Sequence, residues 1–427
     1  MTKVIKRIDA LEILDSRGNP TIRVTIELSS GATVSASVPS GASTGRHEAV
    51  ERRDNDPARY GGKGVLKAIR AVCTEIAPAL IGHDPANQRA IDDILLSLDG
   101  TENKSRLGAN AILGASMAVA RAGAIARDLP LYIHLAPDAQ VRQVLLPVPL
   151  LNVINGGQHA ANALDFQEFM LVPHGAPSFS EAIRYAAETY HALQGILKER
   201  HLVSAVGDEG GFAPDLGGNE EACELIMEAI EKAGFRPGSD VAIALDPAAS
   251  SFGSVADGYT LSKSGGGQFD TQTLIALYET WVQRFPIVSI EDGVAEDDWS
   301  GYAAMTRQLG GRVQIVGDDN YVTNTSFIRR GIAEHSTNAV LIKPNQIGTV
   351  SETIDAISLC QKAGWRAVVS HRSGETEDSF IADLAVALRC SQIKSGAPCR
   401  GERLAKYNRL IEIEIEKGVD AEFFSPF

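Results

Sequence analysis

The chain has 427 residues, of which 44% are hydrophobic and 22% are charged, proportions typical of a folded globular protein rather than a disordered or fibrous one. Its 54 acidic and 40 basic residues give a net charge of −14, which argues against a basic nucleic-acid-binding face and against attachment to an anionic membrane. It has five widely spaced cysteines, no Cys-x-x-Cys pair and no apolar stretch of signal-peptide or membrane-spanning length, so we expect a cytoplasmic protein.

The first third of the chain shows strand patterns followed by helix patterns. Residues 3–14, 21–28 and 33–38 are rich in Val, Ile and Thr with partial alternation, and turn residues separate them. From Gly64 onward, apolar residues instead recur every three or four positions, as in amphipathic helices. We therefore predict a small antiparallel sheet covered by helices, in an α+β unit that ends near Pro130.

A different pattern follows a proline-rich connection over residues 146–151. Short apolar runs each stop at an ionisable residue and are followed by a helical stretch, which is the pattern of successive βα units. The residues that follow these runs are Asp246, Glu291, Asp318, Lys343, His371 and Lys394. Their spacing of 23 to 45 residues suits parallel strands, and in a (β/α)₈ barrel the strand ends converge on one mouth. We expect three carboxylates, two lysines and a histidine to meet there.

Each of these residues alone could be a helix cap or a solvated loop charge, but their repetition at six strand ends favours a common site. Asp246, Glu291 and Asp318 offer hard oxygen ligands without accompanying cysteines, a set that suits Mg²⁺ rather than zinc. Asp292 and Asp319 directly follow two of them, and in an extended chain they would point the other way. We interpret these last two as structural residues around the metal site.

Two alternative roles exist for Lys343 and Lys394. A lysine acts as a general base when nearby positive charge lowers its pKa, and the other lysine together with a divalent ion would supply that charge. The same cations would stabilise the enolate that forms when a proton is removed next to a carboxylate. Either lysine could instead stay protonated and clamp a phosphate or carboxylate, and spacing alone does not choose between these roles.

Glycine-containing segments elsewhere carry further candidate residues. Residues 156–159 and 167–168 form polar clusters, and residues 207–211 form an acidic turn. The glutamate in that turn could protonate a leaving group, or the turn could serve chain geometry alone. Residues 39–45 could be a plain linker or a lid that brings Ser43 to a bound metal or phosphate.

Ordered motifs between Asp15 and Asn408 resemble those of the enolase family. These motifs are Ser-Arg-Gly-Asn-Pro at 16–20, Pro-Ser-Gly-Ala-Ser-Thr-Gly at 39–45, Gly-Gly-Gln-His at 156–159, Gln-Glu-Phe-Met at 167–170, Val-Gly-Asp-Glu-Gly-Gly-Phe-Ala-Pro at 206–214, Ser-Ile-Glu-Asp at 289–292, Leu-Ile-Lys-Pro-Asn-Gln-Ile-Gly at 341–348 and Ser-His-Arg-Ser-Gly-Glu-Thr-Glu-Asp at 370–378. The resemblance implies an α/β fold, with an N-terminal α+β capping domain over residues 1–135 and a C-terminal (β/α)₈-type barrel of the enolase kind over residues 145–427.

The activity implied by the resemblance is the reversible dehydration of 2-phospho-D-glycerate to phosphoenolpyruvate in glycolysis and gluconeogenesis, with two Mg²⁺ ions as cofactors. Lys343 matches the base that takes the C2 proton. Glu209, supported by Glu168, matches the acid that helps the C3 hydroxyl to leave.

Metal and substrate positions are implied in the same way. Asp246, Glu291 and Asp318 match the ligands of one Mg²⁺, and Ser43 matches a lid residue that helps to hold the second. The matched substrate-binding positions are His159, Gln167, Glu168, Glu291, Asp318, His371, Arg372, Ser373 and Lys394. Among these, Lys394 matches the partner of the substrate carboxylate, while Arg372 and Ser373 match the phosphate-binding positions.

Assembly and location follow from the family as well. The resemblance implies a homodimer or a higher assembly of dimers in the cytoplasm, without nucleic acid or a membrane span. Some family members also have a secondary binding role in a cell-surface or secreted pool. The alternatives are a divergent enzyme that removes a proton from another acid, or a binding role only. Retained Glu168, Glu209, Arg372 and Ser373 argue against the divergent enzyme.

The chain departs from the usual family pattern at three places. Ser251 and Gly253 replace a usual Glu and Tyr, and a run of glycines at 265–267 follows in a segment expected to act as a lid. Asn320 and Tyr321 replace a more usual Leu-Phe pair. We expect the first two changes to affect closure of the site more than its chemistry, and the third to affect local packing.

Overall fold

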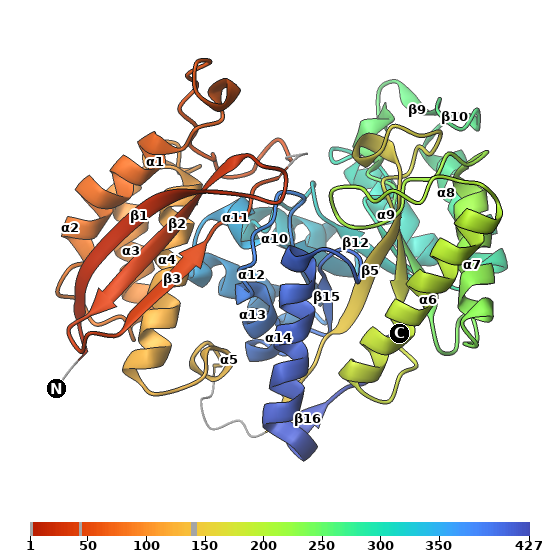
Figure 1. The fold of residues 1–427 in the computed structure, drawn as a ribbon. Helices are drawn as coiled ribbons and strands as arrows, with labels where there is room; N and C mark the ends of the chain where they lie inside the picture. The colour runs from red at the N-terminus through yellow and green to blue at the C-terminus, as the bar shows by residue number, and fades with distance from the viewer. Residues whose placement is uncertain (1–2, 42–44, 138–142) are drawn as a thin grey trace.

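The structure of the protein, a computed structural model, describes residues 3–41, 45–137 and 143–427 (Figure 1). Its N-terminal part contains an antiparallel sheet in the order β1-β2-β3, with helices packed against it (Figure 1). The strands are β1 (Ile5–Leu14), β2 (Pro20–Leu28) and β3 (Thr33–Ser37). The sheet predicted from residues 3–14, 21–28 and 33–38 is thereby confirmed.

Six helical elements follow this sheet, after a short 3₁₀ turn, η1 (Tyr60–Gly62). They are α1 (Leu66–Ala71), the π-helical turn η2 (Val72–Ile76), α2 (Ala77–Leu80), α3 (Gln88–Asp99), α4 (Ala109–Ala126) and α5 (Leu131–His134). The central helix α4 lies on β2 and β3. It approaches β2 closely at Gly114, where a Cβ atom would come within 2.7 Å of Val24.

Helix α4 is also the one helix among the described residues that is long and apolar enough to cross a membrane, judged by length and composition. However, 83% of it is buried within the protein. A helix that is apolar on all sides is typical of a protein core as well as of a membrane, so α4 reads as the core of the N-terminal part.

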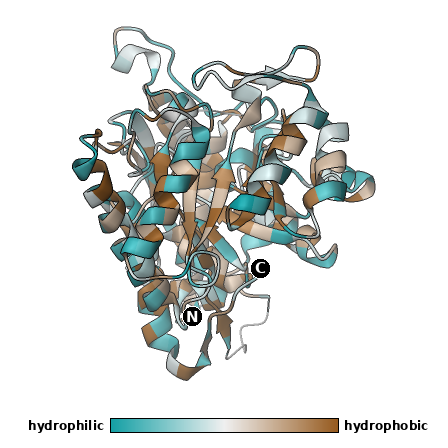
Figure 2. Cartoon of the chain, turned by 90° about the vertical axis from the view of Figure 1, so that its right-hand side faces the viewer, coloured by the Kyte–Doolittle hydropathy of each residue, from teal (hydrophilic) through white to brown (hydrophobic). Residues whose placement is uncertain are grey.

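The larger C-terminal part is a closed eight-stranded barrel in the order β11-β12-β13-β14-β15-β5-β6-β7. Its strands are β5 (Val148–Asn155), β6 (Glu168–Val172), β7 (Ala242–Asp246), β11 (Ile287–Glu291), β12 (Gln314–Gly317), β13 (Ala339–Ile342), β14 (Arg366–Ser370) and β15 (Gln392–Lys394). The six strands predicted from the apolar runs pair in parallel, as expected. Figure 2 shows these hydrophobic strands at the centre, with mixed polar and apolar helices outside.

Two features of the barrel differ from the sequence analysis. Strand β6 runs antiparallel to both β5 and β7, so one strand of the barrel is reversed. The proline-rich residues 146–151, interpreted as a connection, instead include the start of β5, whose residues are all buried. Pro147 and Pro149 obscured the strand pattern, because proline cannot donate a ladder hydrogen bond.

Side chains cap the first turn of several barrel helices, including α6 and α8. Ser178 accepts a hydrogen bond from the backbone of Glu181 at the start of α6, and Asp270 forms a capping box with Thr273 at α8. The helices are α6 (Phe179–Glu199), α7 (Asn219–Lys232), α8 (Thr271–Arg284), α9 (Trp299–Leu309), α10 (Thr325–Glu334), α11 (Pro344–Ile347), α12 (Val350–Lys362), α13 (Phe380–Ala387) and α14 (Gly401–Lys417). Helix α14 packs against α6 and α13 (Figure 1).

The remaining elements are short. The strands β8 (Gly253–Ser254), β9 (Gly258–Leu261) and β10 (Gly267–Phe269) form a small antiparallel sheet, and β4 (Val144–Leu145) pairs with β16 (Ala421–Glu422). Three more 3₁₀ turns are η3 (Gly157–His159), η4 (Ala249–Ser251) and η5 (Gly418–Asp420). The unusual segment around residues 251–267 is therefore a three-stranded sheet rather than an open loop.

Tyr321, one of the unusual residues, is fully buried beside helix α10. Its hydroxyl lies 2.9 Å from the Thr337 hydroxyl. A Cβ atom on Gly331 would come within 2.2 Å of that tyrosine hydroxyl, so the larger side chain fits because residue 331 is glycine. The expected change in local packing is thus accommodated within the barrel wall.

Polar contacts join the two parts of the molecule. Arg121 on α4 forms an ion pair with Asp378 at 2.7 Å, and Lys104 forms one with Glu352 at 2.7 Å. The segment after β3 crosses to the barrel, where Ser40 pairs through its backbone with Gly374. The N-terminal part therefore covers one side of the barrel mouth.

Candidate active site

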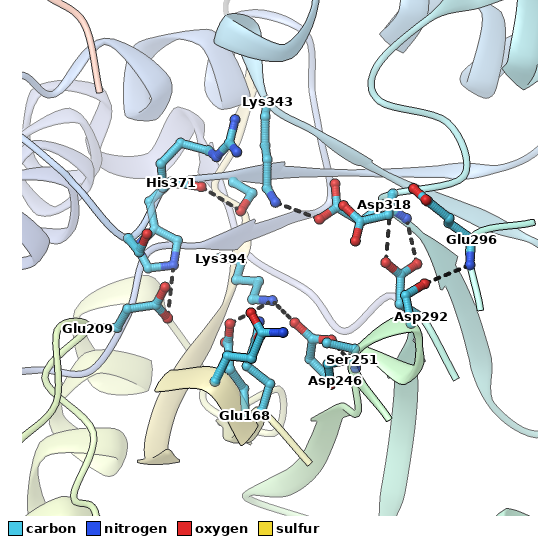
Figure 3. Close-up of a pocket in the computed structure, with 18 residues that line it drawn as sticks. Glu168, Glu209, Asp246, Ser251, Asp292, Glu296, Asp318, Lys343, His371 and Lys394 are labelled. Carbon is cyan, nitrogen blue, oxygen red and sulfur yellow. Dashed lines mark hydrogen bonds and ion pairs between the residues drawn. The ribbon is translucent and has the colours of Figure 1, made fainter. Parts of the chain in front are cut away.

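A cavity of about 290 Å³ lies at the carboxyl end of the barrel strands. Its described lining holds more negative than positive side chains. The carboxylates are Glu168, Glu209, Asp246, Asp292, Glu296, Asp318 and Asp319, and the cations are Lys343, Arg372 and Lys394. Figure 3 shows them converging from several strands and loops. An excess of negative charge of this size requires compensation by a cation or by protonation.

Lys394, at the end of β15, holds three of the carboxylates together. Its ammonium group lies 2.9 Å from Asp246 Oδ2 and 3.2 Å from Glu168 Oε1 (Figure 3). It also lies 2.9 Å from both oxygens of Glu291. Burial alone would lower the pKa of Lys394, but the surrounding carboxylates, led by Asp246, raise it well above the ordinary value. Lys394 is therefore a fixed positive charge in this arrangement.

That single charge does not neutralise its neighbours. Burial, followed by repulsion from Asp246, raises the pKa of Glu291 well above its ordinary value despite Lys394. Burial and then Glu209 do the same to the pKa of Glu168. In addition, Glu168 Oε2 is buried without a hydrogen-bond partner among the described residues. Oxygen donors with unsatisfied negative charge and no cysteine in the described lining fit a hard divalent cation such as Mg²⁺.

Asp318 and Lys343 form a second centre, at the ends of β12 and β13. Lys343 Nζ lies 2.5 Å from Asp318 Oδ2, and Gln346 donates a hydrogen bond of 2.9 Å to Asp318 Oδ1. Burial would raise the pKa of Asp318, but Lys343 and Gln346 outweigh it and lower the pKa. Burial and Arg372 act to lower the pKa of Lys343, but Asp318 raises it overall. Lys343 is thus aimed into the cavity by the group that keeps it protonated.

Glu209 projects from the acidic turn toward His371 at the end of β14. His371 Nε2 lies 3.6 Å from Glu209 Oε2 (Figure 3), and Asn152 donates a hydrogen bond of 3.1 Å to the same oxygen. Burial lowers the pKa of His371 well below its ordinary value, although Glu209 opposes the shift. The imidazole at this site is therefore neutral, with one ring nitrogen as donor and the other as acceptor.

Arg372 and Ser373 directly follow His371 on the loop after β14. Arg372 makes a bidentate pair with Glu48, with Nη1 at 3.0 Å from Oε2 and Nη2 at 3.1 Å from Oε1, and it also donates to Asn345. The Ser373 hydroxyl is buried without a hydrogen-bond partner among the described residues. A guanidinium in a bidentate pair beside a buried hydroxyl has the donor geometry that suits a carboxylate or phosphate.

The predicted alternation at Asp292 is wrong. Asp292 lines the cavity, and its backbone has φ of 43°, so the chain has left the extended conformation there. Its carboxylate accepts hydrogen bonds from the backbone N–H of Asp318 at 2.9 Å and of Asp319 at 3.1 Å, and from the Tyr302 hydroxyl at 2.8 Å. Burial and then Asp318 raise the pKa of Asp292 to about 7. Asp292 thus supports the turn that carries Asp318.

Oxygens of Asp292, Asp318 and Asp319 also lie within 4.8 Å of one another. This trio differs from the set of Asp246, Glu291 and Asp318 expected from the sequence. All three aspartates line the cavity, and Asp292 accepts hydrogen bonds from the backbone N–H groups of the other two. The trio therefore forms the rim of the same site rather than a separate one.

Most site residues expected from the sequence meet in this cavity. Its described lining includes Gln167, Glu168, Glu209, Asp246, Asp318, Lys343, His371, Arg372, Ser373 and Lys394. Glu291 is not part of the lining, but it contacts Lys394 directly. Ser43 and the side chain of His159 lie outside the described residues. Ser251, one of the unusual residues, also lines the cavity.

Several residues that position the site were missed in the sequence. Asn152 on β5 donates hydrogen bonds to Glu209 and, at 2.6 Å, to Asn155 on the same strand. The sequence feature that could have identified them is the presence of two amide side chains within an otherwise apolar run. Gln346 lay inside a recognised motif without an assigned role. Glu48 carried no local signal, because its partner Arg372 is 324 positions away.

Comparison with known proteins gives a consistent match over nearly the whole chain. Residues 5–135 match the family description "Enolase, N-terminal domain", and residues 143–425 match "Enolase, C-terminal TIM barrel domain". The chain is 57% identical over 425 residues to "Enolase" of Desulfotalea psychrophila, which covers 99% of this chain and 100% of that protein. It is 58% identical over 419 residues to "Enolase 1" of Methylococcus capsulatus, covering 98% and 99% respectively. It is 57% identical over 414 residues to "Enolase" of Acidothermus cellulolyticus, covering 97% and 94%.

Proposed function

The chain belongs to the enolase family, the phosphopyruvate hydratases of glycolysis, and from this premise we propose how its own residues carry out the reaction. The reaction is the reversible dehydration of 2-phospho-D-glycerate to phosphoenolpyruvate. The observation that carries the proposal is the meeting of Lys343, Glu209 and Lys394 in one cavity rich in carboxylate oxygens. These groups supply a base, an acid and a carboxylate partner from three separate segments.

The first step is removal of the C2 proton by Lys343, after the substrate carboxylate has been oriented by Lys394. Removing a proton next to a carboxylate places additional negative charge on that carboxylate, so the second lysine stabilises the product of the step. Arg372 and Ser373 hold the phosphate, which fixes C2 in front of Lys343. His371 and Gln167 complete the binding of the substrate, together with His159.

The second step is loss of the C3 hydroxyl, with Glu209 as the acid. Asn152 holds Glu209 Oε2 at 3.1 Å, and Glu168 lies on the neighbouring strand beside Lys394. Glu168 supports the acid because its carboxyl group lies at the same wall of the cavity as that of Glu209. Glu209 therefore donates its proton to the leaving hydroxyl from the side of the cavity opposite to the Lys343–Asp318 pair (Figure 3).

Two Mg²⁺ ions are the proposed cofactors, in keeping with the metal dependence of the family. Asp246, Glu291 and Asp318 would hold one ion, and Ser43 would help to hold the second. When bound, the ions supply positive charge that stabilises the enolate and offsets the carboxylates that now keep Lys343 protonated. The excess of carboxylates and the unpartnered Glu168 oxygen support this proposal.

The chain also divides into two functional parts under this proposal: a capping domain over residues 1–135 and a catalytic barrel over residues 145–427. We propose a homodimer or a higher assembly of dimers, supported by the exposed apolar side chains of Leu11 and Leu14 on β1. A cytoplasmic location is supported by cysteines that are all free, as expected in a reducing compartment.

A direct assay tests the function. Purified protein with 2-phospho-D-glycerate and Mg²⁺ should produce the ultraviolet absorbance of the enol product, and a chelator should abolish it. The variant Asp246→Asn should need far more Mg²⁺ for the same rate. Its matched control is Asp240→Asn, which changes a carboxylate just before the start of β7, where Asp240 pairs with Arg236. Absence of a metal-dependent signal in the wild-type protein would contradict the proposal.

A further inference from the structure

Arg403 on helix α14 is fully buried and points toward the barrel mouth from behind the site. Its side chain is 0% exposed. Nη1 lies 2.5 Å from His371 Nδ1 and 2.6 Å from the Arg372 carbonyl oxygen. Nη2 lies 2.6 Å from the Ser373 carbonyl, 3.0 Å from the Asp208 carbonyl and 3.4 Å from the Ser16 hydroxyl. One guanidinium thus contacts the acidic turn and the loop that follows β14.

A buried guanidinium is costly unless its donors are satisfied. Its Nε lies 3.3 Å from the Glu402 carboxylate in an ion pair, but it makes no hydrogen bond among the described residues. The other end of the group is satisfied by neutral acceptors, which are backbone carbonyls and one imidazole nitrogen. Such a cation does more than fill a packing space, because an apolar side chain would fill the same space without desolvation. Its contacts concentrate on backbone adjacent to residues that line the cavity.

The contact with His371 has a chemical consequence. A guanidinium carries donors only and has no acceptor, so His371 Nδ1 must accept the hydrogen bond. A neutral imidazole with an accepting Nδ1 carries its proton on Nε2. Nε2 is the nitrogen that lies 3.6 Å from Glu209 Oε2 (Figure 3). The ring therefore presents an N–H group, and not a lone pair, to the proposed acid.

We propose that Arg403 is a positioning residue that fixes His371 as its Nε2–H tautomer and ties the Glu209 turn to the loop carrying Arg372 and Ser373. The proposed acid then faces two donors at Oε2, the His371 N–H group and the Asn152 amide. Arg403 acts through His371 and touches no reacting atom. The inference rests on the proposed function for its catalytic meaning, but the tautomer itself does not.

Lys406, on the same helix, provides a matched control. It is also fully buried, and its ammonium group donates to Glu375 Oε2 at 2.8 Å, to the Thr376 carbonyl at 2.6 Å and to the Glu402 carbonyl at 2.7 Å. It therefore supports the far end of the same loop without contacting His371. A purely structural effect of removing a buried cation from α14 should appear in both variants, whereas loss of the tautomer should appear only at Arg403.

The test is nitrogen-15 spectroscopy of histidine-labelled full-length protein, in which His371 is assigned by comparison with His371→Gln. In the wild-type protein, Nδ1 should give a pyridine-type signal and Nε2 a pyrrole-type signal. Arg403→Met should give a mixture of tautomers, Arg403→Lys should partly restore the wild-type pattern, and Lys406→Met should leave it unchanged. A protonated Nδ1 in the wild-type protein overturns the proposal, whether or not any variant folds.

Kinetics provide the second readout. With 2-phospho-D-glycerate, Arg403→Met should lower kcat about 10-fold to 100-fold, as expected for a disturbed acid. A folded Arg403→Met protein that keeps the wild-type nitrogen-15 signals of His371 would contradict the proposal. If the wild-type protein has no activity but shows the Nε2–H tautomer, the proposed function fails while the tautomer assignment stands.

Discussion

Buried charge is treated differently in the N-terminal part and at the barrel mouth. In the N-terminal part, Asp92 is buried among neutral donors, with Ser116 at 2.6 Å and the backbone N–H of Ser351 at 2.9 Å. Burial raises its pKa, although these hydrogen bonds oppose the shift. At the mouth, Lys394 alone contacts three carboxylates. Removing a buried charge that is satisfied by neutral donors should affect mainly stability. Removing one member of the coupled network at the mouth should also change the charge on the catalytic groups.

The sharpest way to break this comparison is to remove the proposed base. Lys343→Ala should lower turnover by at least about 10³-fold and should also abolish hydrogen exchange at C2, because it removes the proposed base for that proton. Turnover and the exchange of deuterium into 2-phospho-D-glycerate measure the two effects. Lys362→Ala, an exposed lysine at the end of α12, is the control and should behave as wild type. Persistent C2 exchange in Lys343→Ala would show that the base is misassigned.

A second change separates the two steps within the mouth. Glu209→Gln should lower dehydration by about 10²-fold to 10³-fold but retain exchange at C2, because the amide cannot protonate the leaving hydroxyl while Lys343 is intact. The ratio of exchange to turnover is the quantity to measure. If exchange and turnover fell together, the acid and base would not be separable groups, and the assignment of Glu209 would be wrong.

The same kind of change in the N-terminal part should affect stability instead. Asp92→Ala leaves the Ser351 N–H and the Gln88 amide without this acceptor, so it should lower the free energy of unfolding by about 2 kcal/mol. Urea unfolding measures the loss, and kcat should stay unchanged. Asp93→Ala, at the exposed neighbouring position on α3, is the control. A large fall in kcat for Asp92→Ala at full folding would erase the contrast between the two regions.

The last expected effect is an acid dependence of stability at His134 on α5. Burial, with a smaller contribution from Arg127, lowers its pKa to about 4. Between the unfolded value near 6.5 and about 4, the unfolded state binds more protons, so stability falls as the pH falls. At pH 5 this histidine should lower the free energy of unfolding by about 2 kcal/mol relative to its value at neutral pH.

The variant His134→Gln should remove that part of the acid dependence. Thermal or urea unfolding from pH 7 to pH 5 measures it against His83→Gln, an exposed histidine in the same part of the chain. Equal acid dependence in the two variants would show that His134 does not resist protonation in the folded protein.

Regular patterns along the chain predicted much of the fold. The three strands of the N-terminal sheet and the six strand ends of the barrel were found because alternation and apolar runs are local signals. Asp246, Asp318, Lys343, His371 and Lys394 were expected to meet because parallel strands of a barrel share one mouth. The reversed strand β6 was not predicted, because strand direction depends on pairing and leaves little local trace.

By itself, the sequence determined the family, the reaction and the chemical types of group at the mouth, since motifs and strand ends are properties of short segments. Only the tertiary structure decided which groups hold those residues in place. Glu48 reaches Arg372, and Arg403 reaches His371, across 324 and 32 positions respectively. Such contacts depend on how the N-terminal part and α14 pack against the barrel. Because that packing also sets burial, it decides the protonation state of each group and so its role in the reaction.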